Sequence, residues 1–176
     1  NLALDPIWRD HAAVLVSDAA PSFSYAPRWF GQLWLALRYP VTLLEQVVDI
    51  RKRWLVASYI RGDLEGSYWG IASEPENYDF DPKAYDPPVY AYSTELIREV
   101  ISQIRIDFDA FSEAEIAVLE NHGYLLAEIA VRRHAGKLVD GPWPRPKVPN
   151  GDWMEEDRVR DALRGSEKTK LLGRKR

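Results

Sequence analysis

Asp18 is the residue whose type and position best suit chemistry. It follows His11–Ser17, the run H-A-A-V-L-V-S, whose continuous apolar character predicts a buried strand of the kind found in parallel sheets. Such sheets place their functional groups at the carboxyl ends of strands, which makes Asp18 a candidate catalytic carboxylate. The alternative is structural, and it is the more common role, because an Asp at a strand end often hydrogen-bonds the loop that follows.

The three histidines are His11, His122 and His134, and no two have the spacing of metal ligands. His11 precedes the predicted strand. It could act as a general base, but the chain shows no nucleophile for it to activate, so we expect an exposed loop histidine. His122 stands in the sequence N-H-G within a predicted helix. We expect its ring to hydrogen-bond a nearby group, and Gly123 to let another helix approach closely.

The standard catalytic and nucleotide-binding motifs are absent from the sequence. Ser67 lies in G-S-Y-W-G, which lacks the spacing of G-x-S-x-G, and there is no G-x-G-x-x-G, G-x-x-x-x-G-K-[ST] or H-E-x-x-H. Asp79, Asp81 and Asp86 could suggest calcium, but they lack the D-x-D-x-D-G frame, and a solvated loop explains them better. We therefore expect no metal site and no cofactor.

The composition excludes several classes of protein. The 176 residues include 23 Lys and Arg, 27 Asp and Glu, and no Cys, which gives a formal net charge of −4. Without cysteine there is no disulfide scaffold and no thiolate metal site. The mild acidity argues against a nucleic-acid partner. No apolar run is long enough to span a bilayer, and the first residues do not form a signal peptide, so we expect a cytoplasmic protein.

The first part of the chain predicts two strands and two helices. After the first strand, Trp29–Tyr39 has helical spacing of apolar residues, and Pro40 is expected to break this helix or to start the next. Val41–Ile60 predicts the longest helix, with an apolar face of Leu43, Leu44, Val47, Val48, Trp54 and Leu55. Gly66–Ser73 predicts the second strand, and a proline-rich irregular loop follows it.

The second part of the chain is mostly helical. Ser93 or Thr94 can cap a helix that buries Ile97, Val100, Ile101 and Ile104. The S-x-x-E capping box of Ser112 and Glu115 opens a helix to about His134, with an inner stripe of Ile116, Leu119, Gly123, Leu126 and Ala130. Beyond Gly136 a proline-rich, extended segment precedes a short helix from a cap at Asp152 to Leu163, and then a basic tail.

The aromatic stripe of Trp29–Leu37 has two interpretations. Its large side chains recur at helical spacing and are flanked by Arg28 and Arg38. Stripes of this kind usually belong to a hydrophobic core. The alternative is peripheral contact with a membrane interface, where an amphipathic helix of this composition can lie.

Five segments of the chain share a pattern with one protein family. They are N-L-A-L-D-P-I-W at Asn1–Trp8, V-L-V-S-D-A-A-P-S-F at Val14–Phe23, Val47–Leu55, Tyr68–Ile71, and Ile104–Tyr124. The last segment is the most specific, through its D-x-F pattern and its N-x-G-Y. Together they resemble bacterial patatin-like phospholipases. The resemblance covers the chain from Asn1 to about His134 and leaves the tail unmatched.

Patatin-like proteins are serine hydrolases that act on acyl esters of lipids through a Ser–Asp dyad, with a glycine-rich loop as the oxyanion hole. The resemblance implies an α/β fold, namely the C-terminal part of a three-layer α/β/α domain that is mostly helical with a few short strands. Asp18 stands in D-A-A, which imitates the family's D-G-A motif. The match of Asn1–Trp8 places the dyad Asp before Asn1, however, and Ala19 and Ala20 depart from the usual glycine.

We therefore expect a fragment of a lipid acyl hydrolase whose dyad lies upstream, so that this chain alone is inactive; its first residue is Asn1 and its sole methionine is Met154. Residues 1–136 would belong to the patatin-like domain, and 137–176 would form the proline-rich segment and basic tail. The partner of the intact protein would be a lipid or acyl ester. The alternative is a non-catalytic interaction subunit that assembles on a partner through an exposed sheet edge.

Overall fold

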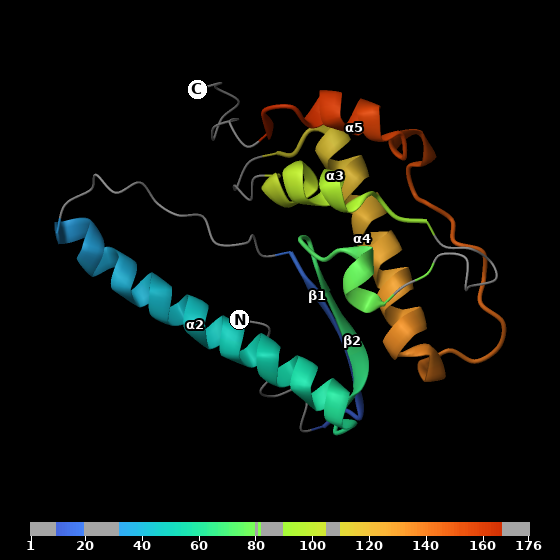
Figure 1. The fold of residues 1–176 in the computed structure, drawn as a ribbon, viewed down its shortest axis with the longest axis horizontal. Coiled ribbons are helices and arrows are strands. Elements are labelled where there is room, and N and C mark those ends of the chain that lie inside the picture. Colours follow the sequence, from blue (N-terminus) through green and yellow to red (C-terminus); the bar gives the residue numbers. More distant parts are fainter. Residues whose placement is uncertain (1–9, 20–31, 80, 82–89, 105–109, 167–176) are drawn as a thin grey trace. The chain divides into compact units, whose positions relative to one another are not determined.

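The computed structural model describes residues 10–19, 32–79, 81, 90–104 and 110–166, with the backbone alone at 32–42, 44 and 45 (Figure 1). The Asn1–Trp8 segment, Asp86, the start of the Trp29–Leu37 stripe and the end of the basic tail lie outside the described residues. The protein is mixed α/β and mostly helical. It divides into a first unit, Asn1–Val16 with Phe23–Tyr68, and a second unit, Ser17–Ser22 with Trp69–Arg176.

Both predicted strands are present, and they pair with each other in parallel. They are β1 (Ala13–Asp18) and β2 (Glu65–Gly70). The Glu65 N–H donates to the Ala12 carbonyl at 3.0 Å, and the Ile71 N–H donates to the Asp18 carbonyl at 3.1 Å, so the register is the same at both ends. The prediction that β1 is buried on both faces is wrong for its middle residue, because Leu15 is 48% exposed. Both strands therefore have their carboxyl ends at the same edge of the sheet.

The strands are connected through one long helix, α2 (Gln32–Arg61). The predicted break at Pro40 is wrong, since the helix runs through it. An interior proline lacks an N–H to donate, and its ring crowds the carbonyl one turn earlier, at a cost of about 3 kcal/mol, yet α2 continues on both sides of Pro40. Within the described residues no helix is both long and apolar enough to cross a membrane.

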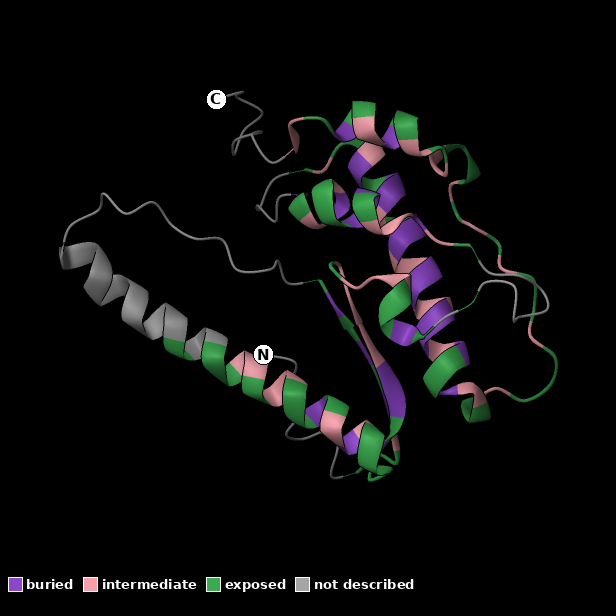
Figure 2. Ribbon diagram, in the orientation of Figure 1, coloured by how far each residue is buried: buried purple, intermediate pink, exposed green. Residues whose placement is uncertain are grey.

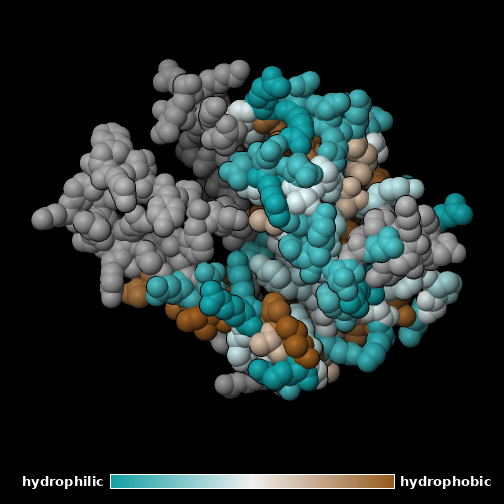
Figure 3. Space-filling model, viewed as in Figure 1, coloured by the Kyte–Doolittle hydropathy of each residue, from teal (hydrophilic) through white to brown (hydrophobic). Residues whose placement is uncertain are grey.

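The predicted apolar face of α2 is only partly buried. Leu55 is fully buried, whereas Leu43, Val47 and Trp54 are exposed. Leu55 packs in a small cluster with Val14 and Val16 of β1 and with Leu64. Figure 3 shows the hydrophobic surface that this leaves on the described part of α2.

Tyr59 ties α2 to β1 within the first unit. Its hydroxyl donates to the Val14 carbonyl at 2.7 Å. Burial raises the pKa of Tyr59 to about 12, so the hydroxyl keeps its proton and remains a donor throughout the neutral range.

The second unit is built around α4 (Glu113–His134). The elements around it are η1 (Pro75–Tyr78), α3 (Thr94–Glu99), η3 (Ile101–Gln103), η4 (Gly136–Leu138), η5 (Gly151–Trp153) and α5 (Glu156–Leu163). Buried positions recur along α4, α3 and α5 (Figure 2). The main core cluster consists of Tyr92, Leu96, Ile97, Ile101, Ile104, Val118, Val159 and Leu163.

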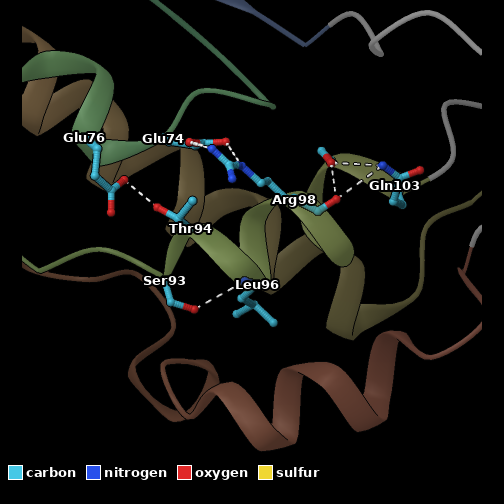
Figure 4. Close-up of polar contacts among 8 residues, drawn as sticks. Glu74, Glu76, Ser93, Thr94, Leu96, Arg98 and Gln103 are labelled. Atoms are coloured by element: carbon cyan, nitrogen blue, oxygen red, sulfur yellow. Dashed lines mark hydrogen bonds and ion pairs between the residues drawn. The ribbon is translucent and has the colours of Figure 1, made fainter.

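The predicted helix starts of α3 and α4 are confirmed. Ser93 caps α3 by accepting a hydrogen bond from the Leu96 N–H at 3.3 Å (Figure 4). Ser112 and Glu115 form the reciprocal capping box of α4. These local signals could be predicted because a cap depends only on residues within one turn.

The inward face of α4 and the cap of α5 differ from the predictions. Ile116, expected in the inner stripe of α4, is 45% exposed, whereas Leu126 and Ala130 are buried as expected. The capping residue of α5 is Glu155 rather than Asp152, because the short η5 turn occupies the residues before it, although α5 ends at Leu163 as predicted.

The segment that leaves β2 is fastened to α3. Glu74 accepts hydrogen bonds from the Arg98 guanidinium, one of them at 2.6 Å from Nη2, and Glu76 accepts one from the Thr94 hydroxyl (Figure 4). The predicted irregular loop thus begins with an ordered turn, η1. These contacts fix the position of the residues that follow Ile71. Ile71 itself is a candidate site residue.

The proline-rich segment lacks regular structure, as predicted, but it is attached to α4 rather than free. The hydrogen bonds that join the two include those from Arg132 Nη2 to the Pro144 carbonyl at 3.0 Å, from the Lys147 N–H to the Tyr124 hydroxyl at 3.0 Å, and from the Asn150 N–H to Asn121 Oδ1 at 2.8 Å. The Arg132 guanidinium also stacks over the Trp143 ring, with its carbon 4.8 Å from the ring centroid.

Candidate ligand-binding pocket

A cavity of about 350 Å³ opens inside the second unit. It is bordered by the carboxyl ends of β1 and β2 and by one side of α4. Its lining consists of Ser17, Asp18, Ala19, Trp69, Gly70, Ile71, Ile104, Phe111, Leu119, His122, Gly123 and Leu126. Small-molecule sites span about 300–1,000 Å³ and are mostly apolar, so this cavity has the size and lining of such a site.

The strands place Asp18 in this lining, at the strand end where the sequence predicted a site. Ser17 lies beside it in the sequence and also lines the cavity. Successive residues of a strand point to opposite faces, so Ser17 and Asp18 do not form a hydrogen-bonded nucleophile and base. The pocket therefore has the features of a binding site, and this pair does not form a Ser–Asp catalytic dyad.

His122 enters the same lining from α4. Its side chain is 3% exposed, and Nε2 lies 2.9 Å from the Ile71 carbonyl oxygen. Because a carbonyl only accepts, Nε2 carries the proton and donates it. Burial lowers the pKa of His122, which favours the neutral ring. The expectation that His122 bonds a nearby group is confirmed.

Ile71 joins the parts of the pocket wall through its backbone. Its N–H donates to the Asp18 carbonyl at 3.1 Å, and its carbonyl accepts from His122. The ends of both strands and α4 are thus linked by consecutive hydrogen bonds around one residue. This arrangement fixes the orientation of the His122 ring at the edge of the cavity.

Gly123 leaves part of the cavity open. The expectation that it allows another helix to approach is wrong, because no described heavy atom beyond its chain neighbours and the adjoining backbone of α4 lies within 4 Å of the place where its Cβ would be. A glycine inside a helix costs about 0.5–1 kcal/mol relative to alanine. In the described part of the chain no packing contact explains that cost, and Gly123 lines the pocket.

Comparison with known proteins adds no family to this description. No family model, curated protein sequence or solved structure matches the chain. A proposal for its function therefore depends on the residues of the pocket and on the sequence resemblance.

The other sequence candidates lie outside the pocket lining. His11 is exposed before β1. Asp79 is exposed, adopts a positive φ of 50°, and contacts the Arg133 guanidinium at 3.3 Å. In the ranges that the structure describes, no group of three His, Asp or Glu residues could hold a metal ion. Asp81 is exposed, and Asp86 is not described.

Several lining residues are not singled out as site residues by their sequence context. Trp69, Ile71, Phe111 and Leu119 come from different elements, and each one alone is an ordinary apolar residue. The one available signal was the N-H-G sequence, since a glycine beside a histidine within a helix is unfavourable for the helix and calls for a packing or functional reason.

The stability of the protein should depend on pH through His122. Its pKa is lower in the folded chain than in the unfolded one, so the unfolded chain binds more protons below about pH 6.5. We expect the free energy of unfolding to decrease as the pH is lowered through that window and to increase as it is raised, with a slope of at most about 1.4 kcal/mol per pH unit from this group. His122→Gln, which does not titrate, should flatten the profile measured by urea denaturation. Parallel profiles for the two chains would contradict this prediction.

Proposed function

We propose that this chain is the acyl-binding portion of a patatin-like lipid acyl hydrolase. In this proposal its strands and helices belong to a three-layer α/β/α domain, and a Ser–Asp dyad outside the chain performs the hydrolysis. The observation that carries it is the apolar cavity at the carboxyl ends of parallel strands, where α/β domains bind their ligands. The resemblance of Val14–Phe23 and Ile104–Tyr124 to the family supplies the substrate class.

The side chains of the lining suit a hydrocarbon chain. Phe111, Leu119 and Leu126 provide apolar surface, and Ile104 and Trp69 extend it. Moving a methylene from water into such surroundings contributes about 0.8 kcal/mol. Affinity for an aliphatic ligand should therefore increase with chain length until the cavity is filled.

Gly123 supports a functional interpretation of the cavity. A Cβ there would meet no heavy atom of the described residues, so alanine would fit and would favour the helix. Glycine gives up that stability and keeps the space open. Natural chains accept such local costs mainly where function needs them.

Replacing Gly123 with Ala should separate stability from binding. We expect the free energy of unfolding to rise by about 0.5–1 kcal/mol, because the helix gains alanine. The added methyl group occupies cavity volume, so a fluorescent fatty acid should bind about threefold more weakly, or about 0.6 kcal/mol. Urea denaturation and a fluorescence titration measure the two effects. A more stable variant with unchanged affinity would contradict the assignment of the pocket.

A larger side chain in the pocket gives a stronger test. Leu119→Trp should reduce binding of the fluorescent fatty acid at least tenfold, because Leu119 lines the cavity. The matched control is Ile116→Trp, one turn away on α4 and exposed. Equal affinities in both variants would exclude this pocket as the site. The chain itself should not hydrolyse 4-nitrophenyl octanoate, and turnover would contradict the placement of the dyad outside it.

In this proposal the protein is cytoplasmic and contacts a membrane surface through Trp29–Leu37. Lipid substrates reside in bilayers, and an aromatic helical stripe suits the interface. Trp34→Ala should weaken sedimentation with phosphatidylglycerol-containing vesicles. Unchanged sedimentation would exclude the membrane contact and would not affect the proposal of an acyl-binding pocket.

A second candidate is a non-catalytic subunit that assembles through its sheet. In the described residues the sheet has two strands, and Leu15 is 48% exposed on one of them. Strand edges and faces of this kind favour pairing with another chain. The Gly123→Ala titration distinguishes the candidates, since an interaction subunit has no reason to bind the fatty acid in this cavity.

A further inference from the structure

The two ring nitrogens of His122 have different surroundings. Nε2 is committed to the Ile71 carbonyl at 2.9 Å. Nδ1 has no hydrogen-bond partner in the described part of the chain. Among the described residues, Ser67 Oγ is the side-chain polar atom that is fully buried and has no hydrogen-bond partner. Nδ1 of His122 also has no partner but does not share that full burial, so it keeps some accessible surface. Because the ring is 3% exposed and lines the cavity, we place that surface on the cavity.

The proton positions make Nδ1 an acceptor. The neutral imidazole donates from one nitrogen and accepts at the other, and the Ile71 carbonyl requires the proton on Nε2. That carbonyl is held in place, because the Ile71 N–H pairs with Asp18 across the strand ends. Turning the ring over would put a C–H group against the carbonyl and would lose this hydrogen bond. The cavity therefore presents one fixed acceptor beside its apolar side chains.

We propose that the pocket selects an apolar chain that carries a hydroxyl group, and that this hydroxyl donates its hydrogen bond to Nδ1 of His122. The inference rests on the proposed function, since it concerns the same cavity, and it adds the class of ligand. An ether or a plain hydrocarbon leaves Nδ1 unpaired. A carboxylate has no proton to donate to Nδ1, so a fatty acid gains only the apolar contacts of the cavity.

Two isomeric ligands test this selection. 1-Octanol and 1-methoxyheptane have the same atoms, but only the alcohol can donate a hydrogen bond. We expect the native chain at neutral pH to bind the alcohol about three- to tenfold more tightly, which corresponds to one net hydrogen bond. Octanoate should bind more weakly than the alcohol. In His122→Phe the alcohol and the ether should bind equally.

A direct readout comes from the imidazole resonances of the native chain labelled with nitrogen-15. The alcohol should move the Nδ1 resonance of His122, the ether should not, and His11 and His134 serve as internal controls. This measurement tests the hydrogen bond to Nδ1 even if the His122→Phe variant does not fold. Equal affinities for the isomers, an unmoved Nδ1 resonance, or tighter binding of octanoate would overturn the hydroxyl inference and leave the pocket in place. Binding of none of the three ligands would overturn the proposed function as well.

Discussion

Replacing Gly66 with Ala is expected to lower the free energy of unfolding by at least about 3 kcal/mol, or to prevent folding. Gly66 lies in β2 with a φ of +143°, a conformation that side chains rarely adopt. A Cβ built there would stand 1.8 Å from the Val14 carbonyl oxygen and 2.8 Å from its carbon. Both are backbone atoms of the paired strand, so neither can move without separating β1 from β2.

A matched control for this variant is Gly62→Ala. Gly62 also has a positive φ, +77°, but no heavy atom of the described residues lies within 4 Å of its Cβ position. It should therefore show only the conformational cost, about 1–2 kcal/mol. Urea denaturation followed by circular dichroism compares the two variants. If they were equally stable, the close approach of β1 to Gly66 would be wrong.

Replacing Asn121 with Leu should cost about 3–4 kcal/mol, because it breaks a buried polar network. Asn121 is fully buried on α4. Its Nδ2 donates to the Asn150 carbonyl at 2.8 Å and to the Tyr92 hydroxyl at 3.2 Å, and its Oδ1 accepts from the Asn150 N–H at 2.8 Å. Leucine has a similar size but leaves the backbone groups of Asn150 without these partners.

The network connects elements that are distant in the sequence. The Tyr92 hydroxyl, which Asn121 contacts, donates in turn to the Trp153 carbonyl at 2.8 Å. Asn77→Leu is the control, since Asn77 is an exposed asparagine of the η1 turn and should change stability by no more than about 0.5 kcal/mol. An Asn121→Leu chain as stable as Asn77→Leu would show that the network contributes nothing.

The features predicted correctly from the sequence were local ones. The Ser93 cap, the Ser112–Glu115 box and the end of α4 at His134 depend on residues a few positions apart. The strand ending at Asp18 was found within a residue of its true end. Each of these features is decided by hydrogen bonds or apolar runs inside a single element.

The errors have a common physical origin, because they concern what lies next to an element in space. The apolar face of α2 was expected to be buried, but among its described side chains Leu43, Val47 and Trp54 are exposed, whereas Leu55 packs with β1. Ile116 was placed inward by its spacing, although the buried residues of α4 lie around Val118, Leu125 and Ile129. Periodicity identifies a stripe, and only the neighbouring elements decide which part of it is covered.

Some individual pocket residues could be predicted from the sequence, but their arrangement in space could not. Asp18, His122 and Gly123 were each singled out in the sequence, with separate explanations. Ile71 brings them together through its two backbone hydrogen bonds, and nothing in an isoleucine beyond a strand end indicates that role. The meeting of strand ends and α4 is a long-range contact, which a single sequence does not encode in any local pattern.

The most direct test of the central claim is to locate a bound aliphatic ligand. We would measure intermolecular nuclear Overhauser effects between 1-octanol and the methyl groups of the intact chain. We predict contacts with Ile104, Leu119 and Leu126, which line the cavity. Contacts confined to Val47, Ile50 and Ile60, which are exposed on α2, would contradict the acyl-binding pocket.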